Sequence, residues 1–388
     1  MDIHVAYQKL REYLIANQYR GYDPYDGSNT SYRLIAQNKL PRLFSTYFNK
    51  FSPVNFRKIL GISPSLQNQA LAFIGRAFIM DFQNNKEEVE KISSILIDQS
   101  LKEKHGFHCW DAHGFPIQMR GSYTPAGTTD IIGNEAIGRF FLDLYEKDSN
   151  SNYRDICLSV KDFLMKELAI VYKDVNHFRY KPITPKYKWC YNASAIGASF
   201  VNAVSETFEK ELKKDFISNC LKDIVDKQKP EGHWYYSLNL ETGFEKPQID
   251  FHQGFVLDAI LEHMQLNGFE KPFLSSYKKG LEFYHQKQFL PNGQGIYRYP
   301  RKWPVNIHNQ AQGIITFTRA AAAGFGEEYH QFARNIAEWT IKNMQDKDGH
   351  FYFLKYPLFT NKIPYIRWSD AAMGYALAVL LAYEQKTH

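Results

Sequence analysis

The sequence contains few cysteines, and they show no metal-ligand pattern. Only Cys109, Cys157, Cys190 and Cys220 occur among 388 residues, and no two have the C-x-x-C spacing of zinc sites and redox motifs. Each lies in or beside an apolar stretch, so we expect buried, reduced thiols rather than disulfides. No base for a nucleophilic thiol at Cys190 is identifiable by spacing. The sequence therefore predicts no metal and no cofactor.

A long uncharged apolar segment is also missing. The longest apolar run, Ala371–Tyr383, is shorter than the roughly 18 residues that a membrane-spanning helix needs. The first residues, MDIHVAYQKLREYLIANQ, carry charges throughout and do not resemble a signal peptide. We therefore expect a cytoplasmic protein without a transmembrane segment.

Signatures of nucleotide and nucleic-acid binding are absent as well. The net charge is +6, but the positive residues are spread along the chain rather than gathered in a basic stripe. The chain has no P-loop, no Rossmann glycine motif and no G-x-S-x-G. Nucleic-acid partners are not expected, whereas a mildly positive field favours an anionic sugar.

Aromatic residues, by contrast, are abundant. Phe, Tyr and Trp make up 16% of the chain, which excludes wholesale disorder because disordered chains are poor in aromatics. A chain of this length can bury a large core. The aromatic side chains should therefore fill that core or line a binding cleft.

A repeat of about sixty residues organises the chain. One series of anchors is a glycine, or once an asparagine, followed by aromatic residues: Gly106, Asn176, Gly232, Gly293 and Gly349. A second series is a glycine inside a helical segment that follows each turn: Gly133, Gly197, Gly254, Gly313 and Gly374. Two series with the same period indicate a repeat architecture.

Each repeat contains two kinds of helix. One kind has apolar residues at i, i+3, i+4 and i+7 and a polar face, which is typical of an outer helix. Examples are Glu87–Leu101, Tyr153–Leu168, Phe216–Gln228, Pro272–Gln286 and Glu328–Gln345. The other kind, small and apolar nearly all round, is typical of a buried inner helix. These segments are Gln69–Phe82, the more polar Ile131–Leu144, Ala193–Val204, Gly254–Met264, Ala311–Ala323 and Ala371–Ala382.

Outer and inner helices that alternate at this period predict an all-α fold. It is an (α/α)6 toroid of six hairpins that close on one another, with short β-like turns between helices. Residues 1–388 then form a single domain, in which residues 1–64 supply N-terminal helices and a loop that close the barrel, and residues 65–388 supply the repeating hairpins. A parallel α/β sheet is not expected, because no β-branched strand runs recur between the helices.

The loops that lead into the inner helices carry the candidate catalytic residues. In such a toroid the N-termini of the inner helices gather at one mouth of the barrel. The candidates there are carboxylates and imidazoles, which suit general acid/base chemistry: Asp23, Asp26, Asp111, Asp250, His252 and His308. Each also has a structural interpretation, since Asp250 can cap a helix and Asp23 and Asp26 can stabilise a turn.

Residues for substrate binding are expected at the same mouth. Aromatic rings can cover the C–H faces of a sugar, while amides and a guanidinium can bind hydroxyl and acid groups. The candidates are Trp110, Tyr191, Asn192, Gln312, Tyr365, Arg367 and Trp368. The expected partner is therefore an oligo- or polysaccharide, anionic or lipid-linked, and the oligomeric state is left open.

Several motifs carry a resemblance to a known family. They are Gly21–Gly27 (GYDPYDG), Phe51–Arg57 (FSPVNFR) with Leu60-Gly61, Phe289–Pro291, Ile307-His308 with Ala311-Gln312, and Ile363–Trp368 (IPYIRW). With them the chain resembles, over almost its whole length, bacterial polysaccharide-biosynthesis proteins of the α/α-toroid type, which are often encoded in capsule and exopolysaccharide clusters. Some of these carry a label as delta-aminolevulinic acid dehydratases, which the missing (β/α)8 pattern contradicts.

At fold level the chain is also similar to six-hairpin glycosidases, N-acylglucosamine 2-epimerases and the helical domain of glucuronyl C5-epimerases. This is an analogy, because one fold hosts many functions. One departure from the polysaccharide-biosynthesis family concerns Cys109–His113, where an F-D-W-Q-like string is expected. The role of Asp111 is therefore not transferred from that family.

The resemblance and the mouth residues together predict a carbohydrate-active enzyme of surface-polysaccharide synthesis. A hydrolase would need two carboxylates that flank the scissile bond. Asp111 paired with Asp23, Asp26 or Asp250 would supply them.

Three other hypotheses remain open. An epimerase or lyase would use His252 and His308 as acid and base, with Arg367 holding a uronate carboxylate. A non-catalytic protein for glycan binding or assembly would bind oligosaccharide without turnover. A terpenoid-cyclase-like toroid matches the Q-x-x-x-G-x-W string at Gln228–Trp234 but lacks the D-x-D-D signature.

Overall fold

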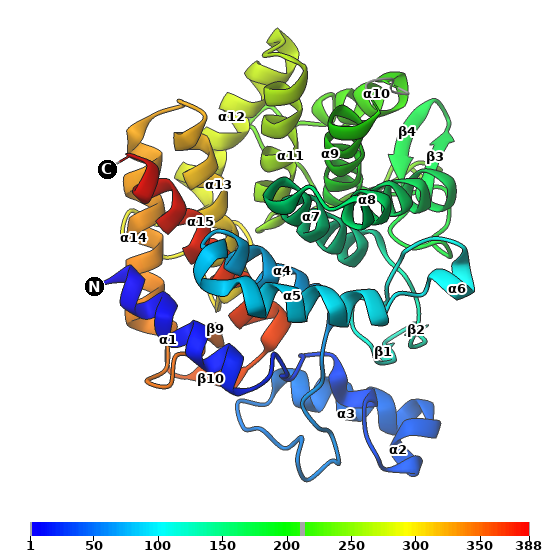
Figure 1. Cartoon of the computed structure of the whole chain (residues 1–388), viewed down its shortest axis with the longest axis vertical. Helices are drawn as coiled ribbons and strands as arrows, with labels where there is room; N and C mark the ends of the chain where they lie inside the picture. Colours follow the sequence, from blue (N-terminus) through cyan, green and yellow to red (C-terminus); the bar gives the residue numbers. More distant parts are fainter. Residues whose placement is uncertain (1, 210–213, 388) are drawn as a thin grey trace.

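The computed structural model describes residues 2–209 and 214–387, in which helices alternate between an inner and an outer ring (Figure 1). The inner helices are α4 (Asn68–Ile79), α7 (Ile131–Asp148), α9 (Tyr191–Phe208), α11 (His252–Asn267), α13 (Ile307–Ala322) and α15 (Ala371–Thr387). The outer helices are α1 (Ile3–Ala16), α5 (Phe82–Asp98), α8 (Ser151–Phe163), α10 (Lys214–Val225), α12 (Lys271–Gln288) and α14 (Glu327–Met344). The predicted all-α toroid is confirmed.

The inner helices form a closed ring. Each packs against the next along the chain, and α15, the last of them, packs against α4, the first. Their sequences explain this burial, because they are apolar on almost every side. In α13, for example, Ala311, Ile314 and Phe317 are all buried. The hydrophobic core therefore lies between the inner and outer rings and continues all the way round.

The glycines of the turns lie against the outer helix of the next repeat. Gly232, Gly293 and Gly349 have φ values of +107°, +88° and +105°, a region that favours glycine. A Cβ atom on Gly232 would lie 2.4 Å from the carbonyl oxygen of Lys279 in α12. A Cβ atom on Gly349 would lie 2.3 Å from the carbonyl oxygen of Lys9 in α1. The N-terminal helix α1 thus takes the place of the sixth outer helix, so the two ends of the chain complete the ring.

Amide side chains of the inner helices hold the segments that follow the turns. In α7, Asn134 accepts a hydrogen bond from the Trp110 amide (2.8 Å) and donates one to its carbonyl (2.9 Å). In α11, Gln253 makes the same two bonds with Trp234, at 2.8 and 2.7 Å. Both indoles are fully buried and donate to a carbonyl of the preceding outer helix. The tryptophans that recur after turn glycines therefore belong to the core of the repeat.

Short antiparallel strands connect the helices. β1 (Ile117–Met119) pairs with β2 (Ser122–Thr124), and β3 (Ala169–Tyr172) pairs with β4 (Val175–Phe178). β5 (Lys188–Cys190), β6 (Ser237–Asn239) and β7 (Glu245–Lys246) form one sheet, and β10 (Thr360–Pro364), β9 (Tyr352–Lys355) and β8 (Val305–Asn306) form another. Because β5–β6 and β8–β9 join segments of successive repeats, these sheets tie together the loops that precede the inner helices.

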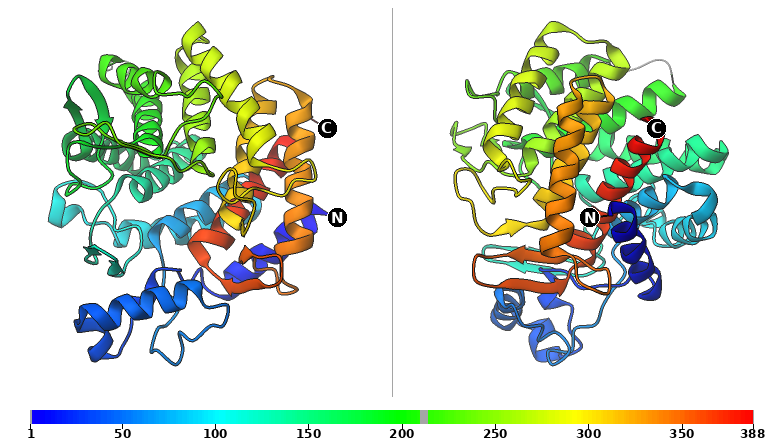
Figure 2. Two further views of the ribbon diagram at one scale, coloured as in Figure 1. Left: turned by 180° about the vertical axis from the view of Figure 1, so that it is seen from behind. Right: turned by 90° about the vertical axis from the view of Figure 1, so that its left-hand side faces the viewer.

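The remaining elements are α2 (Arg33–Gln37), α3 (Lys39–Phe51), α6 (Lys102–His105), the 3-10 turn η1 (Asp26–Ser28) and the π-helical turns η2 (Leu164–Leu168) and η3 (Ile366–Asp370). Helices α2 and α3 project from one end of the ring (Figures 1 and 2), where α3 packs against η1 and β1. Within the described ranges, every helix is too short or too polar to cross a bilayer.

Candidate functional site

The N-termini of the inner helices surround a cavity, here called the mouth cavity. It is lined by Gln69, Phe73, Ile132, Glu135, Tyr180, Asn192, Ile196, Phe251, His252, Phe255, His308, Arg367 and Trp368. Five of the predicted site residues are among them: Asn192, His252, His308, Arg367 and Trp368. The volume is about 90 Å³, below the roughly 300 Å³ at which ligand pockets usually begin. A sugar ring therefore enters only when side chains at the rim move.

His252 begins α11 and is oriented by Asp250. Its Nδ1 lies 2.5 Å from Oδ1 of Asp250, and its ring stacks on Phe251 with 4.2 Å between centroids. Gln248 donates a hydrogen bond to the other carboxylate oxygen, at 2.7 Å. Burial alone would raise the pKa of Asp250, but the bonds from His252 and Gln248 hold it below its ordinary value. The carboxylate is therefore ionised, and its hydrogen bond with Nδ1 orients the imidazole.

His308 lies in α13, on the other side of the same phenylalanine. Its ring centroid is 4.7 Å from that of Phe251 and 5.2 Å from that of Trp368. Burial, with added repulsion from His252 and Arg367, lowers the pKa of His308 to about 3. The imidazole is therefore neutral near pH 7. Its Nδ1 is buried and has no hydrogen-bond partner in the part of the chain that the structure describes.

Arg367 and Trp368 belong to η3, the turn that leads into α15. Arg367 Nη2 lies 2.8 Å from Asp23 Oδ2, and the guanidinium carbon stands 5.0 Å from the centre of the Trp368 ring. Asp23 is fully buried and also accepts a hydrogen bond from the Tyr25 amide. This predicted catalytic carboxylate therefore holds a cation at the mouth. Among the described residues, Nη1 of Arg367 has only a long bond, 3.4 Å, to Gln69, so it retains a donor for an anionic group.

Asp26 and Asp111, two further catalytic candidates, do not line the mouth cavity. Asp26 forms a buried ion pair with Arg57 at 2.8 Å, and burial raises the pKa of Asp26 to about 6 against the effect of that cation. Asp111 accepts hydrogen bonds from the amides of His113 (3.0 Å) and Gly127 (2.6 Å). These bonds hold the pKa of Asp111 below its ordinary value although burial would raise it. Both carboxylates stabilise loops, and the structure does not bring them to the cavity that the predicted histidines line.

Three aromatic residues that were predicted to bind substrate lie in the core instead. Trp110, Tyr191 and Tyr365 are at most 1% exposed. The hydroxyl of Tyr191 donates to Glu245 at 2.8 Å, and that of Tyr365 donates to the carbonyl of Asn49 at 3.2 Å. Their polar groups are therefore already occupied. These residues stand close in sequence to the helix starts at the mouth, but sequence position does not show that their rings turn toward the hydrophobic core.

A second cavity, of about 380 Å³, opens at the other end of the inner ring. Gln312, predicted at the mouth, lines this cavity and donates to Asp258 at 3.0 Å. A buried network runs through the same region, where Arg139 lies 3.0 Å from Glu135 and 2.5 Å from Glu262. Burial raises the pKa of Glu135 although Arg139 opposes the effect. Buried ion pairs therefore line the part of the interior that apolar side chains do not occupy.

Glu135 is a residue at the mouth that sequence reasoning missed. It lines both the mouth cavity and the second cavity. A signal was present, because the segment Ile131–Leu144 is more polar than the other inner helices. Phe251 also lines the cavity and separates the two histidines.

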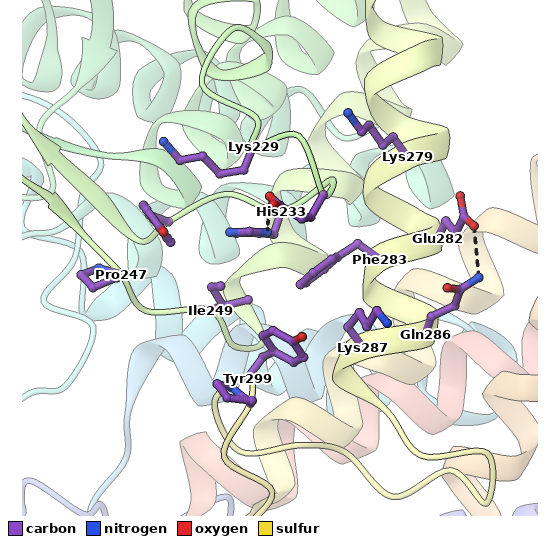
Figure 3. Close-up of a pocket in the computed structure, with 13 residues that line it drawn as sticks. Lys229, His233, Pro247, Ile249, Lys279, Glu282, Phe283, Gln286, Lys287 and Tyr299 are labelled. Atoms are coloured by element: carbon purple, nitrogen blue, oxygen red, sulfur yellow. Dashed lines mark hydrogen bonds and ion pairs between the residues drawn. The ribbon is translucent and has the colours of Figure 1, made fainter.

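A larger cavity, of about 660 Å³, lies on the outside of the toroid (Figure 3). We call it the outer cavity. Helix α12 and loops from two repeats surround it, with His233 and Phe283 side by side at 4.8 Å between ring centroids and Tyr299 below them. His233 is 8% exposed, and neither ring nitrogen has a hydrogen-bond partner among the described residues. Three lysines and two glutamates also line this cavity, which therefore combines aromatic faces with charges of both signs: Lys229, Lys279, Lys287, Glu231 and Glu282.

One group of potential metal ligands occurs within residues 2–209 and 214–387. Asp346, Asp348 and His350 lie close together at the last turn of the repeat. His350 already uses Nδ1 toward Asp348 (2.6 Å) and Nε2 toward the carbonyl of Lys362 (3.1 Å). This arrangement is that of a hydrogen-bonded turn, and it lies outside the mouth cavity. At the mouth itself, burial raises the pKa of Cys190 to about 11, which does not favour a nucleophilic thiolate.

No model of a known protein family matches the chain, and no curated protein is similar to it in sequence. The resemblance to polysaccharide-biosynthesis proteins therefore stays a prediction.

Solved structures share the fold. A cellobiose 2-epimerase from Bacillus thermoamylovorans is 11% identical with a TM-score of 0.67, over 82% of this chain and 88% of that one. A family 76 α-mannanase from Bacteroides thetaiotaomicron is 12% identical with a TM-score of 0.64, over 82% and 86%. The Listeria innocua protein Lin0763 is 13% identical with a TM-score of 0.63 and covers 99% of both chains. At such identities the similarity establishes the α/α toroid and leaves the chemistry to the site itself.

Proposed function

We propose that this chain is a carbohydrate-active enzyme that moves a proton on an acidic sugar of a surface polysaccharide, as an epimerase or a lyase does. The observation that carries the proposal is the pairing of two unlike histidines in one cavity. His252 is oriented by Asp250 at 2.5 Å, and His308 is held neutral. The cation of Arg367 lines the same cavity. The epimerase and the mannanase that share the fold add support for carbohydrate chemistry in general.

The proposed reaction begins at the ring carbon that bears the carboxylate. Nε2 of His252 takes the proton from this carbon, and Asp250 stabilises the positive charge that develops on the imidazole. Arg367 stabilises the negative charge that spreads onto the substrate carboxylate. In a lyase the bond to the leaving oxygen on the adjacent carbon then breaks. In an epimerase the carbon receives a proton on its opposite face.

His308 is the second proton carrier in this proposal. Without substrate it is neutral chiefly because it is buried, and the Arg367 cation adds to this effect. A bound carboxylate would favour the protonated imidazole and raise the pKa of His308. The substrate would thereby charge the residue that protonates either the leaving oxygen or the opposite face of the sugar.

A glycosidase mechanism fits the cavity less well. Two carboxylates are needed, about 5–5.5 Å apart for retention or about 6.5–9.5 Å apart for inversion. Among the described residues that line the mouth cavity, Glu135 is the single carboxylate, and it is already paired with Arg139. Asp23 and Asp250 are bound to Arg367 and His252. The geometry therefore favours proton transfer by imidazole.

Product analysis in D2O tests the reaction. The purified chain is incubated with uronate-containing capsular oligosaccharides, and we expect either deuterium at a ring carbon or an unsaturated sugar. Both signals should disappear in His252→Gln and persist in His4→Gln, which changes an exposed histidine of α1. New reducing ends without either signal would mean hydrolysis and would exclude the proposed mechanism.

The setting in surface-polysaccharide synthesis rests on the sequence motifs. Deletion of the gene should change the uronate composition of the cell-surface polysaccharide, and a plasmid with the intact gene should restore it. An unchanged polysaccharide would remove the biosynthetic assignment but not the chemistry at the mouth.

A second candidate function, glycan binding without turnover, is favoured by the outer cavity. Its aromatic rings and lysines suit an acidic sugar, and its volume, about 660 Å³, exceeds that of the mouth cavity. Calorimetry with the same oligosaccharides should then show binding that Tyr299→Ala weakens by about tenfold, with no new product. Turnover that depends on His252 would exclude this candidate.

A further inference from the structure

Helix α3 is amphipathic, but it buries its polar face and exposes its apolar face. Its buried residues are Ser45, Thr46 and Asn49, which face the η1 loop. Large apolar residues are spaced along its opposite face at i, i+4, i+8 and i+11. They are Leu40, Phe44, Phe48 and Phe51, which are 75%, 69%, 38% and 64% exposed. A soluble helix normally turns such residues inward, but no described residue of the chain covers this face.

The loop that follows α3 extends the same apolar surface. Val54 is 55% and Ile59 is 71% exposed, and Phe56 packs against Phe48 with 5.2 Å between centroids. Leu34 in α2 is 73% exposed. Contiguous exposed apolar residues mark interaction sites in soluble proteins. We call the surface formed by α2, α3 and residues 52–59 the apolar platform.

The charge of the platform is of one sign. The sequence contains no Asp or Glu between Gly27 and Met80. The platform carries Arg33, Lys39 and Lys58, all exposed, together with the half-buried Arg42 and Lys50. Large apolar residues flanked by lysine and arginine are typical of helices that lie in a membrane interface, where cations attract anionic lipid headgroups.

We propose that the apolar platform docks on the surface of an anionic lipid bilayer. Phe44, Phe51 and Leu40 would enter the boundary between headgroups and acyl chains, and the lysines would contact lipid phosphates. The inference does not depend on the reaction at the mouth. Docking would also orient the molecule on the bilayer. The Tyr365 hydroxyl donates a hydrogen bond to the carbonyl of Asn49 in α3, and η3, which follows Tyr365, lines the mouth cavity. The bilayer would therefore lie at the mouth end of the toroid.

A second copy of this chain is a less suitable occupant. A two-fold interface would bring the same surface patch of both copies together. Arg33, Lys39 and Lys58 of each copy would then face their equivalents without a carboxylate from the platform to neutralise them. A lipid surface supplies both the apolar environment and the negative charge.

Vesicle co-sedimentation tests the proposal with the full chain. We expect the protein to sediment with vesicles of equal parts phosphatidylcholine and phosphatidylglycerol, and less with phosphatidylcholine alone. Phe44→Asp should reduce the partition coefficient by about tenfold or more. The matched control is Val171→Asp, which replaces a residue that is 60% exposed on β3 and should bind as the unmodified protein does. Lys39→Gln should weaken binding to the anionic vesicles only, and Lys86→Gln in α5 should not.

Three results would overturn the proposal. The protein could stay in the supernatant with both kinds of vesicle, or Phe44→Asp could bind as tightly as Val171→Asp. Light scattering could also show a dimer that Phe44→Asp converts to a monomer while vesicles are not bound, which would make a second copy the occupant. Thermal melts of the variants, monitored by circular dichroism, verify that they are folded, since Phe44 makes few contacts that folding requires.

Discussion

His252 and His308 begin successive inner helices at equivalent places of the repeat, but their surroundings differ. Asp250 precedes the first and holds its Nδ1 at 2.5 Å, whereas Asn306 precedes the second and its side-chain oxygen accepts a hydrogen bond from the His308 amide at 3.0 Å. One imidazole is therefore oriented by a negative charge, and the other is neutral with a buried, unpartnered Nδ1. A repeat can therefore place two copies of one residue at one site while its loops give them different hydrogen-bond partners.

The largest effect should come from removing the oriented histidine. In His252→Ala the proposed base is lost, and we expect the rate of deuterium incorporation or elimination to fall by about 1,000-fold. The rate is measured under saturating oligosaccharide. A fall of less than about tenfold would show that His252 is not the base.

Replacing its partner should have a smaller effect. Asp250→Asn keeps the shape of the side chain but removes the charge that fixes the tautomer of His252, so we expect kcat to fall by about 100-fold. KM should change little, because Asp250 does not line the cavity. If KM rises instead while kcat is unchanged, Asp250 contributes to substrate binding. Its proposed role in orienting His252 would then be wrong.

The third prediction contrasts the stabilities of the two sites. His308→Phe removes a buried nitrogen that has no partner, so we expect the free energy of unfolding to rise by about 1 kcal/mol while activity is lost. His252→Phe breaks the bond to Asp250 and removes one partner of that buried carboxylate, which keeps its bond from Gln248, so stability should fall by about 1–3 kcal/mol. Urea unfolding measures both. If the free energy of unfolding changes in the same direction in both variants, the proposed difference between the surroundings of His252 and His308 is contradicted.

The fourth prediction concerns the dependence of stability on pH. The pKa of His308 is about 3 in the folded protein against an ordinary value of 6.5, so between these values the unfolded chain binds more protons. Stability from this group is therefore present above about pH 6.5 and lost as the pH falls toward about 3, by at most about 1.4 kcal/mol per pH unit. Unfolding at a series of pH values should show a shallower loss in His308→Gln. Parallel curves for the two proteins would mean that His308 is not buried as described.

The repeat and its helices were predictable from sequence because their signals are local. Apolar spacing and turn glycines such as Gly232 and Gly349 depend on residues within one repeat. The N-terminal helices were expected to close the barrel, but nothing in Ile3–Ala16 shows that α1 packs beside Gly349 at the far end of the chain. Ring closure depends on contacts between residues more than 300 positions apart, which no local pattern contains.

The site was predictable only in part, for the same reason. Asn192, His252 and Arg367 stand where the repeat places helix N-termini, and they line the mouth cavity. Trp110 and Tyr191 stand near such positions too, but their rings turn into the core. The direction of a side chain at a helix start depends on the neighbouring repeat, so sequence position alone could not separate these cases.

The sequence by itself determined the toroid, the polar and aromatic content of one mouth, and a stretch of more than fifty residues without acidic side chains. The tertiary structure decided which partner each candidate carboxylate has. Asp23, Asp26, Asp111 and Asp250 are each bound to a cation, a backbone amide or an imidazole, because a buried carboxylate is stable only with such partners. It also turned the apolar face of α3 outward. The polar face of this helix packs against the η1 loop, and the sequence alone does not show that contact.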